Sequence, residues 1–503
     1  MGSHEALFTA LGTASIIFFV IVGIALAFIV VMAITAIIDK FQHSDAIRHN
    51  YPFIGHFRYW FMHLGVFFRA YFFAEDREEM PFNRVEREWV YRAGQNRSTT
   101  AAFGSTRQTT PGSVSFANGA FAPLEVDHVK PSEITFGPQT KNPYTTTSFF
   151  HVSAMSFGAL SAPAVLALSH GAKMAGIMMD TGEGGISPYH LEGGADLVAE
   201  LGTAKYGYRT PDGKLDDDKL RKAAARPQVK MFSIKLGQGA KPGKGGLLPG
   251  VKVTKEIAEI RGIPEGQDSD SPNRWPEISN VEELLDMIEH IRTITEKPTG
   301  FKFVMGNDTF IKDLCKAINK RGKDSAPDFI IVDSANGGTA AAPQSLMDYV
   351  GMNVQESLPI VVDTLIQHGL KERVKVGVSG KLINPGAVAW ALCMGADYIN
   401  SARGFMFSLG CIQAMRCHLD TCPTGVTTQK KHLQAGLDPR VKKVRVMNYA
   451  NNILKQVGVI AHSCGVDDPR DLRREHVRVL DANGVSKAVD TLWPYPKEES
   501  AAN

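Results

Sequence analysis

The sequence predicts an α/β chain whose main domain is a (β/α)8 TIM barrel. Short apolar runs alternate with helical patterns from about residue 147 onward, and each run ends in Gly, Ser or Lys. Such runs, apolar on both faces, are typical of parallel strands covered by helices. The seven clear runs are "SFFHVSAMS", "AGIMMDTG", "VKMFSIKLG", "GFKFVMG", "DFIIVDSANGG", "RVKVGVSGK" and "DYINSARG". With an eighth strand expected between Lys241 and Gly300, a closed barrel fits better than an open sheet.

After a tail of residues 1–10, residues 11–38 predict a single transmembrane helix. The run is free of charge over about 28 positions, and about 20 are enough to cross a bilayer. A secretory signal is disfavoured because the start carries Glu5 and no Lys or Arg. Basic residues follow the helix and none precedes it: Lys40, Arg48, Arg58 and Arg69. This asymmetry predicts a single-pass protein of the cell membrane with its catalytic domain in the cytoplasm.

Residues 39–80 are dense in Phe, Tyr and Trp, and we expect amphipathic helices that lie at the membrane interface. A second span would bury charges such as Arg58 and Arg69 at a cost of a few kcal/mol each. An ordinary core helix of the next domain remains the alternative. Residues 81–125 are rich in Ser, Thr, Gly and Asn and predict a linker or cover segment. The barrel is then expected over residues 126–470, followed by a C-terminal tail, 471–503.

The charge of the chain is nearly balanced. Lys and Arg number 55 against 52 Asp and Glu, a net charge of +3. Nucleic-acid-binding domains usually carry a marked basic excess, so we expect no nucleic-acid partner. The oligomeric state is left open, with a homo-oligomer among the possibilities.

Three of the six cysteines lie in the stretch "GCIQAMRCHLDTCPTG", residues 410–425. Disulfides are rare in the cytoplasm, so metal binding or burial are the options. Cys315, Cys393 and Cys464 are expected to be structural. Thiolates favour an iron–sulfur or a zinc site. A structural zinc site normally has four protein ligands, and His418 could supply the fourth, so the residues alone leave both open.

The loops after the seventh and eighth expected strands, "VSGKLINPG" and "NSARGF", offer Gly380, Lys381, Arg403 and Gly404. In TIM barrels these two loops commonly hold a phosphate group. No dinucleotide or ATP motif occurs, so we expect a phosphorylated cofactor at the barrel mouth. Lys302 lies within a strand, where its charge needs a partner, either a ligand or a salt bridge.

Several segments together resemble the FMN-binding synthase domain of glutamate synthase, over roughly residues 125–470. They are "AMSFGALS", "TGEGGISP", "KLGQGAKPGKGGLLPGVKV", "NGGTAAAP" and "LGCIQAMRCHLDTCPTGVTTQ". The resemblance implies FMN at the barrel mouth beside a [3Fe–4S] cluster held by Cys411, Cys417 and Cys422. It implies substrate-binding roles for Lys235, Gln238, Lys241 and Arg261, and catalytic roles for Glu183 and Lys302. The expected cofactor-binding residues are Met155, Ser156, Gly158, Thr181, Lys302, Gly337, Gly338, Ser379, Gly380, Lys381, Arg403 and Gly404.

The chain also departs from that family. Ser379 and Asn336 stand where the family commonly has Asp, which affects the expected flavin contacts. The first cysteine is Cys315, so the N-terminal nucleophile of a glutaminase domain is missing. Ammonia or another amine must therefore come from outside.

The expected function is that of an oxidoreductase acting on CH–NH2 donors, which converts 2-oxoglutarate to glutamate. It would use external ammonia or an amine and an external electron donor: ferredoxin, a quinone or a reductase subunit. The two carboxylates of 2-oxoglutarate require cationic side chains to bind them, and Lys235, Lys241 and Arg261 can supply these. Glu183, in "TGEGG", is expected to act as acid or base or to guide ammonia. The alternatives are an N-methylglutamate-synthase-like reaction with methylamine, a membrane-bound flavin and iron–sulfur electron carrier, and a membrane scaffold.

Overall fold

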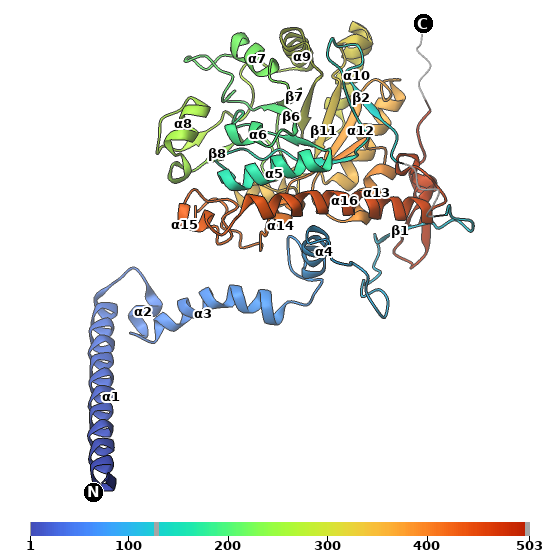
Figure 1. The fold of residues 1–503 in the computed structure, drawn as a ribbon. Helices are drawn as coiled ribbons and strands as arrows, with labels where there is room; N and C mark the ends of the chain where they lie inside the picture. Colours follow the sequence, from blue (N-terminus) through green and yellow to red (C-terminus); the bar gives the residue numbers. More distant parts are fainter. Residues whose placement is uncertain (1, 125–129, 498–503) are drawn as a thin grey trace. The chain divides into compact units, whose positions relative to one another are not determined.

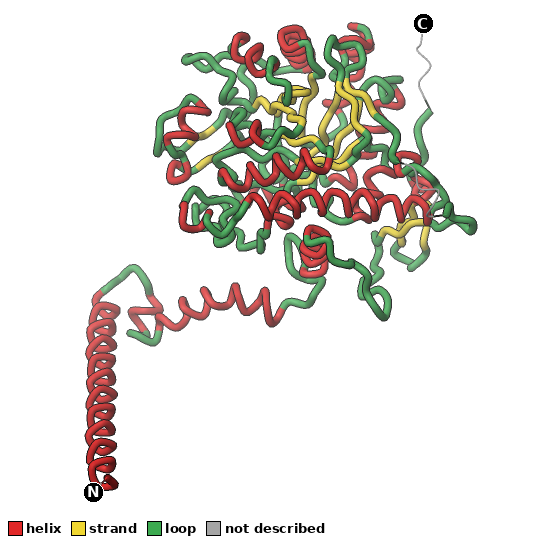
Figure 2. The backbone as a smooth tube through the Cα atoms, viewed as in Figure 1, coloured by secondary structure: helices red, strands yellow, loops and turns green. Residues whose placement is uncertain are grey.

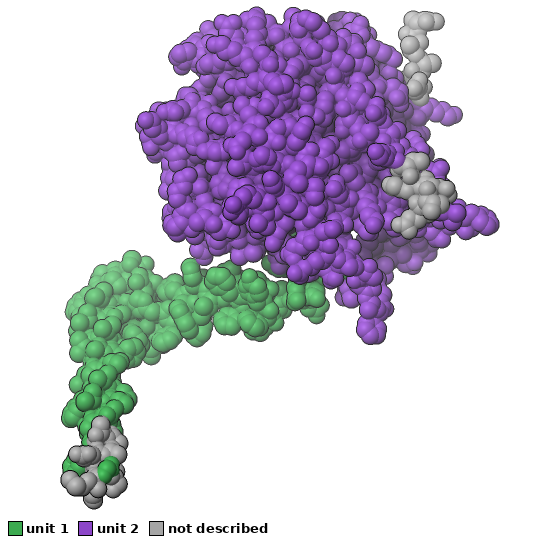
Figure 3. Space-filling model, viewed as in Figure 1, with its two compact units in different colours: residues 1–85 green, residues 86–503 purple. Residues whose placement is uncertain are grey.

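The computed structural model describes residues 2–124 and 130–497 (Figure 1). The chain divides into two compact units, Met1–Val85 and Glu86–Asn503, shown in different colours in Figure 3. Each unit is described by itself.

The first unit consists of helices. They are α1 (Gly2–Phe41), α2 (Ala46–Asn50), α3 (Gly55–Phe68) and a π-helix (Arg69–Phe73). Within α1, Leu11–Phe41 has a mean hydropathy of 3.2 and exposed side chains, and it is long enough to cross a membrane. Buried Asp39 accepts hydrogen bonds from the Phe53 backbone N–H at 2.9 Å and from His56 Nε2, which ties the end of α1 to the α2–α3 segment.

The second unit is built on a closed barrel of eight parallel strands, seen in yellow in Figure 2, which confirms the predicted TIM barrel. Each strand pairs with the next along the chain, and the last pairs with the first, as right-handed βα units produce. The strands are β4 (Phe150–Val152), β5 (Met178–Asp180), β6 (Asp196–Leu201), β7 (Val229–Lys235), β10 (Thr299–Phe303), β11 (Phe329–Asp333), β12 (Lys375–Ser379) and β13 (Tyr398–Ser401).

The expected position of the eighth strand was wrong. The strand that the sequence pattern did not reveal is β6. The only complete strands between Lys241 and Gly300 are β8 (Leu247–Leu248) and β9 (Ser269–Asp270), a short antiparallel pair outside the barrel. The sequence of β6, "DLVAEL", carries two carboxylates and did not read as an apolar run. Its Glu200 is nevertheless buried, because Lys302 pairs with it.

Helices surround the barrel and alternate with its strands. They are α5 (Ala162–Ala175), α6 (Pro188–Glu192), α7 (Asp217–Ala224), α8 (Lys255–Arg261), α9 (Val281–Thr295), α10 (Thr309–Arg321), α11 (Gln344–Tyr349), α12 (Val354–Gln367), α13 (Pro385–Cys393), α14 (Arg403–Leu409), α15 (Lys431–Gln434) and α16 (Pro439–Ser463). Helix α5 packs on α16 at Gly171, where a Cβ would lie 2.5 Å from Val446 Cβ. The thiols of α10 and α13, Cys315 and Cys393, are buried as expected.

A β-hairpin closes the N-terminal end of the barrel. It consists of β2 (Ile134–Phe136) and β3 (Tyr144–Thr146). The buried ring of Phe136 contacts the rings of Phe329 and Tyr398, which begin β11 and β13. Because an aromatic cluster fills this end, the opposite end, where the strands finish, is left for a site.

The segments on either side of the barrel in sequence pack against it or against each other. Helix α4 (Arg84–Gly94) lies on α16, where Asn448 Nδ2 and Asn452 Nδ2 each donate a 3.1 Å hydrogen bond to the backbone oxygens of Gly94 and Ala93. A three-stranded sheet joins β1 (Val114–Phe116), β14 (Val477–Leu480) and β15 (Ser486–Ala488), and α17 (Val489–Leu492) follows. Short 3-10 turns cover Gly250–Lys252, Lys323–Ser325, Pro469–Asp471 and Arg474–His476.

Candidate active site

Charged side chains gather where the barrel strands end. Lys235 is the last residue of β7, Lys302 lies near the end of β10, and Asp333 ends β11. In a parallel barrel all these ends meet at one mouth, which explains why residues far apart in the sequence come together.

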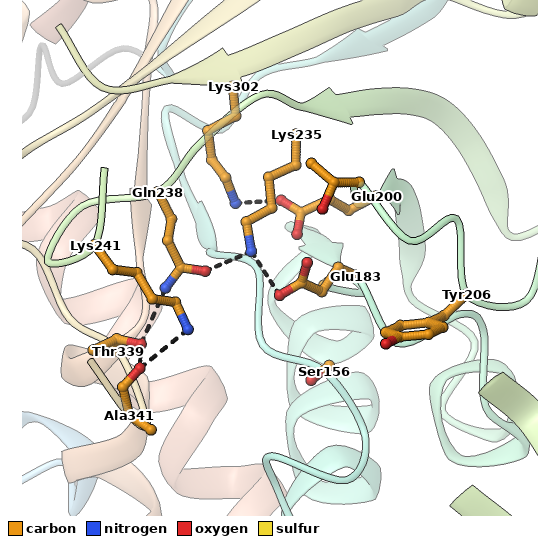
Figure 4. Close-up of polar contacts among 12 residues, drawn as sticks. Ser156, Glu183, Glu200, Tyr206, Lys235, Gln238, Lys241, Lys302, Thr339 and Ala341 are labelled. Atoms are coloured by element: carbon orange, nitrogen blue, oxygen red, sulfur yellow. Dashed lines mark hydrogen bonds and ion pairs between the residues drawn. The ribbon is translucent and has the colours of Figure 1, made fainter. Parts of the chain in front are cut away.

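Lys235 is the centre of the cluster drawn in Figure 4. Its Nζ donates to Glu183 Oε1 at 2.8 Å and to Gln238 Oε1. Gln238 Nε2 in turn donates to Thr339 Oγ1 at 3.1 Å. Three of the predicted site residues, from two loops, therefore form one hydrogen-bonded chain.

Lys241 lies beside this chain and is only 3% exposed. Its Nζ donates to the backbone oxygen of Ala341 at 3.1 Å, an oxygen that also accepts from Thr339 Oγ1. Burial, together with the neighbouring charge of Lys235, lowers the pKa of Lys241 to about 8. An anionic ligand would relieve both effects.

Arg261 ends α8 and is almost fully buried. It donates to Ser156 Oγ at 3.2 Å and to the Phe157 backbone oxygen at 3.3 Å, and its guanidinium lies over the Tyr206 ring. No hydrogen bond of Lys235, Gln238 or Lys241 to Arg261 is formed within the described part of the chain.

The four charged groups are nevertheless coupled through Glu183. Burial by itself would raise the pKa of Glu183, but the charges of Lys235, Lys241 and Arg261 lower it to about 2. Glu183 is therefore ionised at neutral pH. Three cations act on this one carboxylate, so the cluster has an excess of positive charge that an anionic ligand such as a dicarboxylate would balance.

Lys302 forms a buried ion pair with Glu200 in which both side chains are almost fully inaccessible. Of the two partners considered for Lys302, the structure provides the salt bridge. A second buried carboxylate, Asp180, lies close enough for burial and the charge of Glu200 to raise its pKa. Burial would lower the pKa of Lys302, but Glu200 and Asp180 raise it well above its usual value. The cluster thus joins one buried cation to two buried acidic side chains.

Two further cations lie close together at the ends of β12 and β13. Burial and the charge of Arg403 lower the pKa of Lys381, and burial lowers the pKa of Arg403 to about 10. Gly338 gives Arg403 room, since a Cβ there would lie 2.8 Å from Arg403 Nε. Gly380 has a φ of 132° and lies against Ser334, so a side chain would not fit. This cationic, glycine-lined position is suited to a phosphate group.

The other expected cofactor residues follow strands at the same end of the barrel. They are Met155, Ser156 and Gly158 after β4, Thr181 after β5, Gly337 after β11, Ser379 at the end of β12, and Gly404 after β13. Asp333 connects two of these loops, because its carboxylate accepts from Ser379 Oγ at 2.6 Å and from the Gly239 backbone N–H at 2.7 Å.

The cysteine loop follows α14 and carries Cys411, Cys417 and Cys422. Tyr91 Oη of α4 donates to the Cys411 backbone oxygen at 2.6 Å. Buried Lys252 Nζ donates to the backbone oxygens of Ala159 and Cys417 at 2.7 and 3.2 Å. Lys252 thereby ties the cysteine loop to the loop that carries Ser156.

Among residues 2–124 and 130–497, no three His, Cys, Asp or Glu side chains lie close enough to hold one metal ion. A tetrahedral zinc site with His418 and a cluster held by the three thiols would both need Cys411, Cys417 and Cys422 around one centre, so this observation bears equally on the two.

Four residues of this region escaped the sequence reasoning: Glu200, Asp333, Thr339 and Lys252. The signal for Glu200 was a carboxylate in a run otherwise suited to a strand, and Asp333 ends a strand that was itself recognised. Lys252 and Thr339 had no signal, because their importance depends on contacts between distant loops.

The closed parallel barrel, with its charged groups collected at the carboxyl ends of the strands, defines a protein of the TIM-barrel enzyme class. The match to known proteins is more specific. Residues 112–467 match the family model described as "Conserved region in glutamate synthase". The chain belongs to the glutamate synthase family of oxidoreductases.

Relatives of two kinds are similar to this chain. The glutamate synthase large subunit-like protein YerD of Bacillus subtilis (strain 168) is 37% identical, with 94% of this chain and 97% of that protein covered. The archaeal glutamate synthase [NADPH] of Methanocaldococcus jannaschii is 32% identical over 68% of this chain and 64% of that protein. The chain thus spans less than two thirds of the archaeal enzyme. Among solved structures, a flavocytochrome b2 variant with sulfite bound aligns with a TM-score of 0.46 and 15% identity, covering 88% of this chain and 92% of that one.

Proposed function

We propose that the protein is an FMN- and [3Fe–4S]-dependent oxidoreductase that reductively aminates 2-oxoglutarate to glutamate. The amine and the electrons come from outside the chain. The observation that carries the proposal is the charge of the site: Lys235 pairs with Glu183, and the charges of Lys241 and Arg261 act on the same carboxylate, so cations are in excess where a dicarboxylate would bind. A bare electron carrier would have no use for such a site.

Different residues of this chain serve different steps of the proposed reaction. Lys241, Gln238 and Arg261 bind and orient the dicarboxylate. Because the pKa of Glu183 is lowered to about 2, this carboxylate stays ionised and is suited to hold an ammonium ion, whereas it is both a weak base and a poor proton donor. Condensation of the keto group with the amine releases water and forms an imine. When bound, FMN would supply the hydride that reduces this imine, with electrons delivered through the cluster.

An anaerobic reoxidation assay tests the function. Protein with reduced flavin is mixed with 2-oxoglutarate and either ammonium or methylamine, while flavin absorbance and product mass are followed. We expect reoxidation only when keto acid and amine are both present, with glutamate as the product. N-methylglutamate with methylamine alone would reassign the amine, and indifference to every amine would remove the synthase activity.

The phosphate of FMN is proposed to lie at Lys381 and Arg403, where burial lowers both pKa values and the charge of Arg403 lowers that of Lys381 further. Lys381→Ala removes one charge-assisted contact, worth roughly 1.5–3 kcal/mol, so FMN affinity should fall by about 10–150-fold. The measurement is a flavin fluorescence titration of the apoprotein. Lys375→Ala, at the start of the same strand, is the matched control, because Lys375 Nζ contacts the Glu372 backbone oxygen instead.

The cluster is proposed at Cys411, Cys417 and Cys422. We expect about three irons per chain in protein prepared without oxygen, as three ligands and the family resemblance imply. Cys417→Ser should lose the iron, measured by metal analysis, while Cys464→Ser should keep it. Zinc in place of iron would contradict the cluster.

The anchor is proposed to be Leu11–Phe41, with the barrel in the cytoplasm. Protease added outside intact cells should leave residues 130–470 uncut, and cleavage there would reverse the orientation.

A further inference from the structure

The stretch from residue 411 to residue 447 has an unusual charge. It contains seven Lys and Arg against two Asp and Glu, a net charge of +5 within a chain whose total is +3. One of the two carboxylates, Asp420, is buried, and the other, Asp438, pairs with Arg440. The remaining basic residues form no ion pair within the described residues; they are Arg416, Lys430, Lys431, Lys442, Lys443 and Arg445.

These residues belong to the cysteine loop, α15 and the first half of α16, which lie near one another in the second unit (Figure 1). Lys442 Nζ lies 3.0 Å from the Cβ position of Gly410, which precedes Cys411, and the Arg445 backbone oxygen lies 3.4 Å from that of Gly94 in α4. Burial, together with the charge of Arg445, lowers the pKa of Lys442.

Apolar side chains are interspersed with the charges. Ile412, Met415, Leu419, Val441 and Val444 are all exposed. A surface of Lys and Arg with exposed aliphatic side chains between them is the combination that binds anionic bilayers, where headgroups meet the cations and aliphatic groups enter the interface.

The segment between the aromatic helices and α4 is short. Only ten residues separate Phe73, at the end of the aromatic helices, from Arg84, the first residue of α4, so their separation cannot exceed about 35 Å. Two contacts make the connection shorter still. Arg84 Nη1 donates to Asp76 Oδ1, and the Val85 backbone N–H donates to the Asp76 backbone oxygen, each at 3.2 Å. Helix α4 then contacts both α16 and the Cys411 backbone.

We propose that this basic face, residues 411–447, is a second membrane-contact surface that binds anionic lipid headgroups. It rests on the proposed anchor, which supplies the bilayer. The contact would hold the cysteine loop at the membrane surface, so that electrons enter the protein from a donor in or on the bilayer.

The test uses full-length protein in nanodiscs of phosphatidylcholine alone or with about a third phosphatidylglycerol. Reductive methylation of individual lysines is followed by mass spectrometry. At about 0.1 M salt we expect methylation of Lys430, Lys431, Lys442 and Lys443 to slow roughly fivefold or more in the anionic discs. Lys312, Lys316 and Lys320 of α10 should react equally in both. At about 1 M salt, where the Debye length is about 3 Å, the difference should vanish.

A charge-reversal variant sharpens the result. Lys430→Glu/Lys431→Glu/Lys443→Glu should remove the lipid dependence at Lys442, whereas Lys312→Glu/Lys316→Glu/Lys320→Glu should keep it. Equal rates in both kinds of disc, with the protein incorporated, would overturn the proposal and leave the anchor standing. Shielding that depends on an added acidic protein and not on lipid would overturn it in favour of a protein-docking face. Failure to enter discs at all would remove the anchor and the lipid surface together.

Discussion

Lys241→Ala is expected to weaken 2-oxoglutarate binding by about 10–150-fold. The change removes a charge-assisted contact to a carboxylate, worth roughly 1.5–3 kcal/mol. Lys241 is buried beside Lys235, so the ligand's charge is neutralised where water is scarce. The measurement is a titration of oxidised protein with 2-oxoglutarate, read from the flavin spectrum. Flavin content without 2-oxoglutarate should barely change.

Lys244→Ala is the matched control, because Lys244 is an exposed lysine of the same loop. The affinity of the Lys244→Ala protein for 2-oxoglutarate should stay within a factor of about two of the wild-type value, as expected for an exposed charge. A pH series adds a second readout. Because the pKa of Lys241 is about 8 in the free protein, wild-type affinity should decline as the pH rises through that value, and the Lys241→Ala protein should lack this decline. Unchanged affinity in Lys241→Ala would exclude the dicarboxylate site.

Lys302→Met is expected to destabilise the barrel by about 3–5 kcal/mol near pH 8, since it leaves Glu200 buried without its partner. The control is Glu200→Leu/Lys302→Met. Replacing both members of a buried pair with apolar side chains is often close to neutral, so the double variant should recover most of the loss. Both variants lack Lys302 and any flavin contact that it makes, so the difference between them isolates the ion pair. Melting temperatures at one scan rate provide the comparison.

Much of the fold could be predicted because the barrel strands are mostly apolar on both faces. Seven strands were found from this pattern, and the burial of Cys315 and Cys393 followed from their helical context. Strand β6 was missed because a search for strands that are apolar on both faces takes a charged residue such as Glu200 as solvent-exposed. Its burial depends on Lys302, which is 102 residues away in sequence.

The candidate site was likewise predictable only in part. Residues within one loop, such as Lys235 and Gln238, could be recognised by type and spacing. Contacts between loops could not: Lys252 reaches both Ala159 and Cys417, and only the closed barrel brings these segments together.

The carboxylate of Asp333 has a consequence for how ligands communicate. It holds Ser379, at the end of the strand that leads to Lys381, and Gly239, in the loop between Gln238 and Lys241. If FMN and the dicarboxylate bind as proposed, we expect a shift of either loop to reach the other through this shared acceptor. Under thermodynamic linkage the effect is reciprocal: the factor by which FMN changes the affinity for the dicarboxylate is the factor by which the dicarboxylate changes the affinity for FMN. The change in FMN affinity on keto-acid binding and the change in keto-acid affinity on FMN binding thus measure the same coupling free energy. Asp333→Asn is the substitution that should reduce it.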